Sequence, residues 1–169
     1  MYLRPAAPGD EDPVAQVHVR SWQTGYRGLL PDEFLDRLDP AERAARYTFG
    51  QVDRGLPSTT IAVDGDQICG FATTGPCRDE DRAGAGELYA IYVDPDWWGH
   101  GVGRELIVAT RQRLSDQHFS SAILWMLAGN ARAERFYRLD GWSPDGTCAR
   151  REIAGLEADE VRLARPGLT

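Results

Sequence analysis

The stretch that decides the fold of this chain is residues 87–104, ELYAIYVDPDWWGHGVGR. Its first half, Glu87–Val93, is rich in aromatic and β-branched residues and predicts the strongest strand of the sequence, which Pro95 closes. Three glycines, each two residues from the next, lead into Gly103–Gln117, where apolar residues recur at helical spacing. The sequence therefore predicts a strand, a glycine-rich turn and a helix in succession.

A similar order of elements follows this helix. Ser121–Leu127 is another apolar run that predicts a strand, and Asn130–Leu139 predicts a second helix, which Gly141 ends. Strand, helix, strand and helix in succession are typical of a crossover between two parallel strands. We therefore expect an α/β fold with a locally parallel sheet at its centre.

The rest of the chain predicts shorter elements on both sides of this centre. Asp64-Gly65-Asp66 lies between two β-branched and apolar runs and predicts a hairpin. Near the end of the chain, Pro144-Asp145-Gly146 predicts a turn, and EVRLA at 160–164 predicts an edge or hairpin strand. Before the hairpin we expect a strand at Tyr2–Arg4 and helices at Asp10–Arg27, with Asp10 as a cap, Pro31–Leu38 and Pro40–Phe49.

Length and composition restrict the classes of protein that fit. The 169 residues, of which 42% are hydrophobic, suffice for one domain with a core, so we expect a single domain over residues 1–169. No run approaches the roughly 18 apolar residues of a membrane span, and the first residues lack the pattern of a signal peptide, which predicts a cytoplasmic protein without a membrane partner. The three cysteines form no Cys-x-x-Cys pair, so we expect neither a disulfide framework nor a metal site.

The charge pattern argues against nucleic acid as a partner. The formal net charge is −7, and no basic face is visible along the chain. All 19 basic residues are arginines, so any chemistry that requires a lysine is excluded. A neutral or cationic small molecule fits this charge better.

Glycines between a strand and a helix are typical of a phosphate-binding loop, because loop N–H groups and the positive end of the helix can face an anion. A Walker A loop needs a lysine, which this chain does not have. A dinucleotide-binding G-x-G-x-x-G fingerprint needs a third glycine where Arg104 or Leu106 stands. A tight turn in which glycine only permits close packing is the remaining alternative.

Two segments, LYAIYVDPDWWGHGVGREL at 88–106 and LWMLAGNARAERFYRLDGW at 124–142, resemble the two central motifs of the GCN5-related N-acetyltransferase (GNAT) superfamily. The first is similar to its acyl-CoA signature, a strand, V-x-P and then [Q/R]-x-x-G-x-[G/A]. The second is similar to its strand, Asn, helix with Phe-Tyr, and Gly-aromatic pattern. Trp98 stands where the family has Gln or Arg, so the resemblance implies that backbone amides grip the pyrophosphate, with Arg104 as the nearest candidate for a charge.

The resemblance also implies a fold and a co-substrate. It implies a mixed central sheet of about seven strands flanked by helices, with the two central parallel strands splayed apart. The pantetheine arm of acetyl-CoA lies in that gap in the manner of an added strand. The implied cofactor contacts are Ile91, Tyr92, Val93, Gly99, His100, Gly101, Val102, Gly103, Arg104, Asn130, Ala133 and Tyr137.

Acetyl transfer to an amine requires a proton for the departing thiolate and stabilisation of an oxyanion. Tyr137 lies seven residues, or two helical turns, after Asn130 and matches the family tyrosine that donates to the CoA sulfur. A core aromatic beside Phe136 is the alternative for Tyr137, and an ordinary helix N-cap is the alternative for Asn130. For the oxyanion we expect a backbone N–H near Ile91.

The amine must also lose a proton, and Glu87 is the predicted base. It opens the central strand and is expected to share a face with Tyr89, Ile91 and Val93, because strand side chains alternate. A solvent-facing strand-end glutamate is the alternative. Tyr89 and His18 are weaker candidates for this role.

The acceptor is the least specified part of the prediction. Trp22 and Tyr26 share a helix face and are expected to bind the substrate together with Tyr89, unless they belong only to the core. The acidic loop at 79–81 would attract an ammonium group, unless it is only a solvated charge run. We expect an acetyl-CoA-dependent N-acetyltransferase that acts on a small primary amine by direct transfer. The alternatives are an acetyltransferase for protein or peptide amines and a non-catalytic acyl-CoA sensor, and a homodimer is common among the proteins that this chain resembles.

Overall fold

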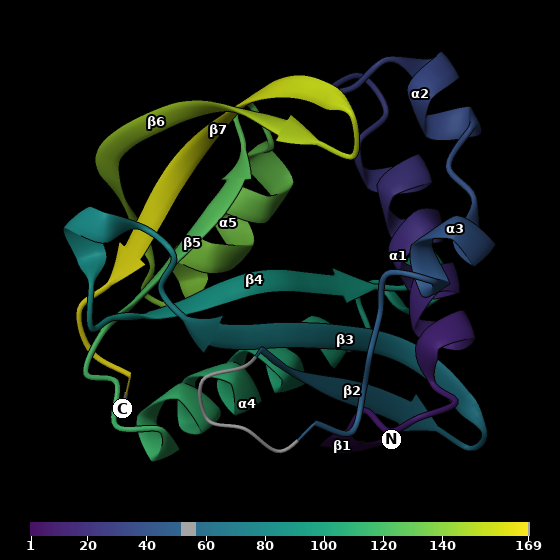
Figure 1. Ribbon diagram of the computed structural model, residues 1–169, viewed down its shortest axis with the longest axis horizontal. Helices are drawn as coiled ribbons and strands as arrows, with labels where there is room; N and C mark the ends of the chain where they lie inside the picture. The colour runs from purple at the N-terminus through teal and green to yellow at the C-terminus, as the bar shows by residue number, and fades with distance from the viewer. Residues whose placement is uncertain (52–56, 169) are drawn as a thin grey trace.

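The architecture is one mixed sheet with helices on both of its faces (Figure 1). A computed structural model describes residues 1–51 and 57–168. Seven strands lie in the order β1-β2-β3-β4-β5-β7-β6, which confirms the expected α/β class and the sheet of about seven strands. The strands are β1 (Tyr2–Pro5), β2 (Ser58–Asp64), β3 (Gln67–Pro76), β4 (Gly86–Val93), β5 (Ala122–Leu127), β6 (Ser143–Ile153) and β7 (Leu156–Arg165).

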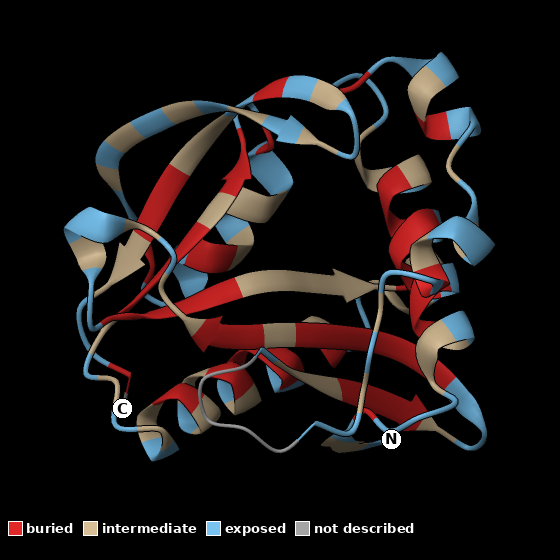
Figure 2. Cartoon of the chain, in the orientation of Figure 1, coloured by how far each residue is buried: buried red, intermediate tan, exposed pale blue. Residues whose placement is uncertain are grey.

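Helices α1 (Glu11–Gly25) and α4 (Val102–Asp116) pack on opposite faces of the sheet. The other helices are α2 (Asp32–Asp36), α3 (Pro40–Ala44) and α5 (Ala131–Leu139), with short 3-10 turns η1 (Glu80–Arg82) and η2 (Pro95–Trp97). On one face, here called the α1 face, Val17 of α1 packs against Phe71 of β3. On the other, here called the α4 face, Leu106 of α4 packs against Leu88 of β4. The buried residues follow these two interfaces (Figure 2).

The two central strands separate after a short parallel ladder. β4 and β5 pair only over Gly86–Leu88 and Ala122–Leu124. β5 continues to pair with β7 as far as Leu127, whereas Tyr89–Val93 of β4 has no neighbour on the β5 side in the part of the chain that the structure describes. The predicted parallel pair and its splay are both confirmed, and the splay leaves backbone N–H and C=O groups of β4 free to bind an extended ligand.

A β-bulge interrupts β4 where the splay begins. Thr73 of β3 lies opposite Ala90, but the next residue, Thr74, lies opposite Leu88, so Tyr89 is an extra residue without a partner across the ladder. An extra residue in one strand reverses the alternation of side chains beyond it. The side chains of β4 therefore change faces at Tyr89.

This reversal corrects the expected orientation of Glu87. Residues opposite one another in a ladder share a face, so Glu87 lies on the α1 face with Tyr92, whereas Ile91 and Val93 lie on the α4 face. The expectation that Glu87 shares a face with Ile91 and Val93 is wrong. A regular strand would have placed them together, and the bulge prevents it.

The C-terminal hairpin also differs from expectation. The chain turns at Ala154-Gly155, and Pro144-Asp145-Gly146 lies inside β6, where the register shifts, instead of forming the turn between strands. The predicted strand at 160–164 is part of β7, which lies between β5 and β6 and is therefore a hairpin strand and not an edge strand. Ile153 and Leu156, at the tip of this hairpin, pack against the cluster that contains Trp22 of α1.

Smaller corrections concern the N-terminal helices. Asp10 accepts hydrogen bonds from Arg4 at 2.7 and 2.9 Å and from the amide of Ala7 at 2.8 Å, and it makes no side-chain cap on α1. The predicted helix Pro40–Phe49 ends at Ala44, and the residues after it turn back to pack on the α1 face. None of the helices in the described ranges is both long and apolar enough to span a membrane.

Candidate active site

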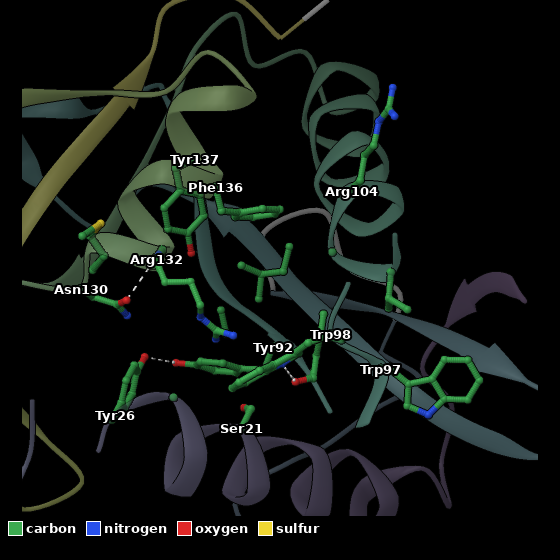
Figure 3. A pocket seen from close by; sticks show the side chains of 18 of the residues that line it. Ser21, Tyr26, Tyr92, Trp97, Trp98, Arg104, Asn130, Arg132, Phe136 and Tyr137 are labelled. Carbon is green, nitrogen blue, oxygen red and sulfur yellow. Dashed lines mark hydrogen bonds between the residues drawn. The ribbon is translucent and has the colours of Figure 1, made fainter. Parts of the chain in front are cut away.

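A cavity of about 380 Å³ lies between the splayed strands. Its walls come from α1, β4, the loop before α4, β5 and α5, and Figure 3 shows their side chains converging on it from these elements. The cavity includes residues of both sheet faces, so it passes through the sheet at the splay. Of the predicted site residues, those that line it are Tyr26, Tyr89, Ile91, Tyr92, Val93, Gly99, Gly101, Val102, Gly103, Arg104, Asn130, Ala133 and Tyr137.

Three predicted site residues do not line the cavity: Trp22, Glu87 and His100. Trp22 packs behind its wall, with ring centroids 5.2 Å from Tyr26 and 6.1 Å from Tyr92. His100 keeps its ring nitrogen Nδ1 within 3.0 Å of the carbonyl of Trp98. The Trp22 and His100 side chains therefore contact neighbouring residues and not the cavity.

The loop before α4 is built to present amide groups. Gly99 and Gly101 have φ values of +80° and +85°, a region that residues with a β-carbon rarely adopt. Gly101 is also the N-cap of α4 and makes no side-chain cap, which leaves the first N–H groups of the helix available to an anion. Gly103 serves packing, because a Cβ there would lie 3.3 Å from the Phe136 ring. Arg104 extends away from Tyr137 and Trp98 along the outside of α4 (Figure 3).

Tyr137 and Asn130 hold the α5 side of the cavity. The side chain of Tyr137 is 9% exposed, and its hydroxyl points into the cavity (Figure 3). Burial raises the pKa of Tyr137, so the hydroxyl keeps its proton at neutral pH and can donate it. Asn130 caps α5 by accepting a hydrogen bond from the amide of Ala133 at 3.1 Å, and it also lines the cavity.

Glu87 is a buried partner of Arg78. Its side chain is 1% exposed and accepts hydrogen bonds from the backbone amide, Nε and Nη2 of Arg78 at 2.9, 3.2 and 2.6 Å. These bonds occupy both carboxylate oxygens. The arrangement holds the Arg78 side chain in place more directly than it prepares Glu87 for proton transfer.

His18, the weaker candidate for a base, is part of the core. Its Nδ1 lies 2.6 Å from the Tyr47 hydroxyl, and its ring stacks on Tyr92 at 4.6 Å. Burial, together with the charge of Arg43, lowers the pKa of His18 to about 3. The imidazole is therefore neutral, and it does not line the cavity.

Two of the three acidic side chains of the loop at 79–81 are already bound by arginines. Arg162, which is 3% exposed, binds Asp79 at 2.9 Å, Asp81 at 2.7 Å and Asp145 at 2.8 Å. The hydrogen bonds from Arg162 lower the pKa of Asp81. Asp79 also accepts from Arg151 at 3.0 Å. Asp79 and Asp81 are therefore neutralised by arginines of β6 and β7, whereas Glu80 is exposed and has no ion-pair partner among the described residues.

Several cavity residues have no clear signal in the sequence. Trp98 donates its indole N–H to the carbonyl of Val93 at 2.8 Å, and the Arg132 guanidinium lies 3.6 Å from the centroid of the Trp98 ring. Burial lowers the pKa of Arg132, and no carboxylate of the described residues lies within 4.0 Å of it. Trp125 of β5 also lines the cavity. For Arg132, the one signal in the sequence was its position two residues after Asn130, a predicted cofactor contact.

Glu160 of β7 is a second carboxylate on the α1 face that the sequence did not indicate. It lies opposite Leu127 in the ladder, and its side chain is 14% exposed. Its nearest basic partner among the described residues is Nε of Arg151 at 4.0 Å. Burial raises the pKa of Glu160.

Comparisons with known proteins agree with this geometry. Residues 18–142 match the acetyltransferase (GNAT) family. The chain is 33% identical to the N-acetyltransferase YuaI of Bacillus subtilis, over 99% of this chain and 94% of that protein. It is 34% identical to mycothiol acetyltransferase of Actinosynnema mirum, over 83% of this chain but only 44% of that protein.

A solved structure shows the same fold. The PaiA N-acetyltransferase of Thermoplasma acidophilum, crystallised in complex with coenzyme A, superposes with a TM-score of 0.74 at 15% identity over 98% of both chains. The splayed strands, the amide-presenting loop and the family match over most of the sequence lead to one conclusion. The chain is an acyltransferase that belongs to the acetyltransferase (GNAT) family.

Proposed function

We propose that this protein transfers the acetyl group of acetyl-CoA directly to a primary amine of a small molecule. The observation that carries the proposal is the continuity of one cavity. It joins the amides at the start of α4, the unpaired edge of β4 and the hydroxyl of Tyr137. In acyl-CoA, the pyrophosphate would meet the amides, the pantetheine arm the strand edge and the thioester the hydroxyl, in the order in which they lie along the cavity.

The residues present fit acetyl-CoA, which supplies an activated thioester when it is bound. The amides from Gly99 to Arg104 would hold the pyrophosphate, since α4 begins there without a side-chain cap. The backbone of Ile91 and Val93, which has no neighbour on the β5 side among the described residues, would pair with the pantetheine arm, although the Val93 carbonyl already accepts a hydrogen bond from Trp98. Arg132 brings a cation without a carboxylate partner among the described residues into the same cavity, which suits an anionic ligand.

Transfer forms an amide bond at the acceptor nitrogen and releases a thiol. The ammonium form of the acceptor must therefore lose a proton, and the departing sulfur must gain one. Tyr137, whose hydroxyl stays protonated because its pKa is raised by burial, would donate to the sulfur. A backbone N–H near Ile91, on the unpaired edge of β4, would stabilise the oxyanion.

A carboxylate on the α1 face would accept the proton of the amine through water. Glu87 was the expected base, but both of its oxygens are bound by Arg78. Glu160 does not line the cavity either, but it lies on the same face, accepts no side-chain hydrogen bond from the described residues, and has a pKa that burial raises. We therefore assign proton acceptance to Glu160 and the positioning of Arg78 to Glu87.

Release of CoA across a panel of small amines and peptides tests this function. We expect acetyl-CoA to raise the melting temperature and small amines to release CoA faster than peptides with the same first residue. Preference for peptides would favour the alternative acceptor class. Binding of acetyl-CoA without turnover of any acceptor would favour the acyl-CoA sensor. The expected homodimer stays a prediction that sedimentation velocity tests.

A further inference from the structure

The end of the cavity on the α1 face is walled by aromatic rings from three elements. These rings belong to Tyr26, which caps the end of α1, Tyr89 and Tyr92 of β4 and Trp125 of β5, and we call them the aromatic end of the cavity. Trp125 lies opposite Arg162 in the ladder and shares the α1 face with Leu127. The loop before α4 lines the opposite part of the cavity, so the aromatic end is where an acceptor would meet the acyl group.

Two guanidinium groups lie directly against these rings. The Cζ atom of Arg78 is 4.2 Å from the centroid of Tyr89, and Cζ of Arg151 is 3.9 Å from the centroid of Trp125. Both side chains remain accessible, since Arg78 is 61% and Arg151 is 36% exposed. Neither arginine lines the cavity itself, and each lies against a ring that does, Tyr89 or Trp125.

Acidic partners fix one edge of each guanidinium and leave the other edge free. Arg78 is held by Glu87 through Nε and Nη2, and Arg151 is held by Asp79 through Nη2. Within the described ranges, Nη1 of Arg78 and Nη1 of Arg151 have no hydrogen-bond partner. A guanidinium has five N–H donors, so each of these arginines keeps oriented donors that another oxyanion can use.

The other charges near this end do not favour a second cation on the acceptor. Asp79, Asp81 and Asp145 are bound by Arg162, as described above. Glu87 is bound by Arg78, and Glu160, with its nearest base at 4.0 Å, suits one ammonium group, the one that is acetylated. A polyamine would bring further ammonium groups to Arg78 and Arg151, which would repel them.

We propose that the acceptor is an amine that also carries a carboxylate, as an amino acid does, and that Arg78 and Arg151 bind this carboxylate. The inference rests on the acetyl transfer proposed above and names its substrate class. An arginine already oriented by a carboxylate on one edge and an aromatic ring on its face loses little side-chain entropy when it binds a second carboxylate. Asp79 of the acidic loop thus acts on the acceptor indirectly, by positioning Arg151, and Glu87 does the same for Arg78.

The test compares amines that differ only by the carboxylate. Phenylalanine with phenethylamine and leucine with isoamylamine are suitable pairs, and CoA release gives kcat/KM for each compound. We expect the carboxylated member of at least one pair to have the higher kcat/KM, by about tenfold or more, since hydrogen bonds between charged groups are worth about 1.5–3 kcal/mol. Equal values, or higher values for the decarboxylated amines, would overturn the proposal.

Variants of the two arginines locate the effect. Arg151→Met should lower the preference, measured as the ratio of kcat/KM for the two members of a pair, about tenfold. The ratio is the readout because Arg151 also lies 4.0 Å from Glu160, and an effect on that carboxylate is shared by both amines. Arg78→Met alone would leave Glu87 buried without its partner, so Arg78→Met is combined with Glu87→Gln. Arg78→Lys is a second variant, which keeps the positive charge but loses the planar set of N–H donors of the guanidinium. Arg150→Met is the matched control, because Arg150 is the neighbouring arginine of β6 and, within residues 1–51 and 57–168, pairs only with exposed Glu157 and Asp159. A preference that survives both arginine variants contradicts the assignment.

A binding experiment separates this inference from the proposed function. With CoA present, the carboxylated amine should raise the melting temperature of the wild type more than that of Arg151→Met, whether or not turnover occurs. Binding of this kind without turnover would contradict the transfer activity alone. Turnover of amines without any carboxylate preference would contradict the substrate class alone.

Discussion

The indole Nε1 of Trp98 donates a hydrogen bond to the carbonyl oxygen of Val93 at 2.8 Å. This bond ties the loop before α4 to the end of β4, and the ring of Trp98 carries the Arg132 guanidinium on its face. Trp98, which stands where the family has Gln or Arg, therefore positions the cation of Arg132 from α5 beside the cavity.

Arg132, and not Arg104, is expected to contribute charge to CoA binding. Arg132→Ala should raise the Kd of CoA about tenfold, because it removes a guanidinium that Trp98 holds beside the cavity and that no carboxylate of the described residues neutralises. Arg104→Ala should change it less than about twofold, since that side chain extends along α4 away from Tyr137 and Trp98 (Figure 3). Isothermal titration calorimetry at low and at physiological salt measures both values. A larger loss in Arg104→Ala would reverse the assignment.

Tyr137 is expected to act as the proton donor to the thiolate. Tyr137→Phe should lower kcat about a hundredfold and leave the Kd of CoA nearly unchanged, because the ring keeps its packing while the hydroxyl is lost. Single-turnover measurements and CoA titration separate these two effects. Phe136→Leu serves as a control for packing beside it, and an undiminished kcat in Tyr137→Phe would remove the acid role.

The two carboxylates of the α1 face are expected to behave differently. Ionisation of a carboxylate base makes kcat/KM rise with pH, so Glu160→Gln should flatten that rise. Glu87→Gln should keep the rise and increase KM for the acceptor several-fold, because a neutral amide holds Arg78 less firmly. The pH profile of kcat/KM, recorded for both variants, checks this. A flat profile in Glu87→Gln alone would restore the role first predicted for it.

His18 is expected to make stability depend on pH. Its folded pKa of about 3 lies below the unfolded value of 6.5, so the unfolded state binds the proton first. This contribution to the free energy of unfolding is complete above pH 6.5 and is lost as the pH falls toward 3. Between pH 7 and pH 5 the wild type should lose about 1–2 kcal/mol more than His18→Phe, in which this titration is absent. Urea unfolding at both pH values measures it, and equal losses would show that His18 does not titrate in this way.

The strand and helix order around the glycine loop follows from the sequence alone. Apolar spacing at Glu87–Val93 and the glycines before α4 define local backbone geometry, which depends on residues near in the chain. The same is true of the Asn130 cap, whose hydrogen bond spans three residues. Spacing therefore predicted the parallel pair, whereas the splay and most of the correctly predicted cavity residues were implied by the resemblance of the two motifs to the GNAT superfamily.

Tertiary structure decided which side chains face one another. The bulge at Tyr89 depends on how β3 and β4 align, and it moved Glu87 to the face opposite Ile91. The acidic loop looked available to a substrate, but Arg162 binds it from 81 residues away in the chain. Likewise, Arg132 stacks on Trp98 only because the splay brings α5 beside the end of β4. Spacing along the sequence encodes the period of a strand or helix, whereas charge pairing and burial depend on distances in space, which strand register and sheet order determine.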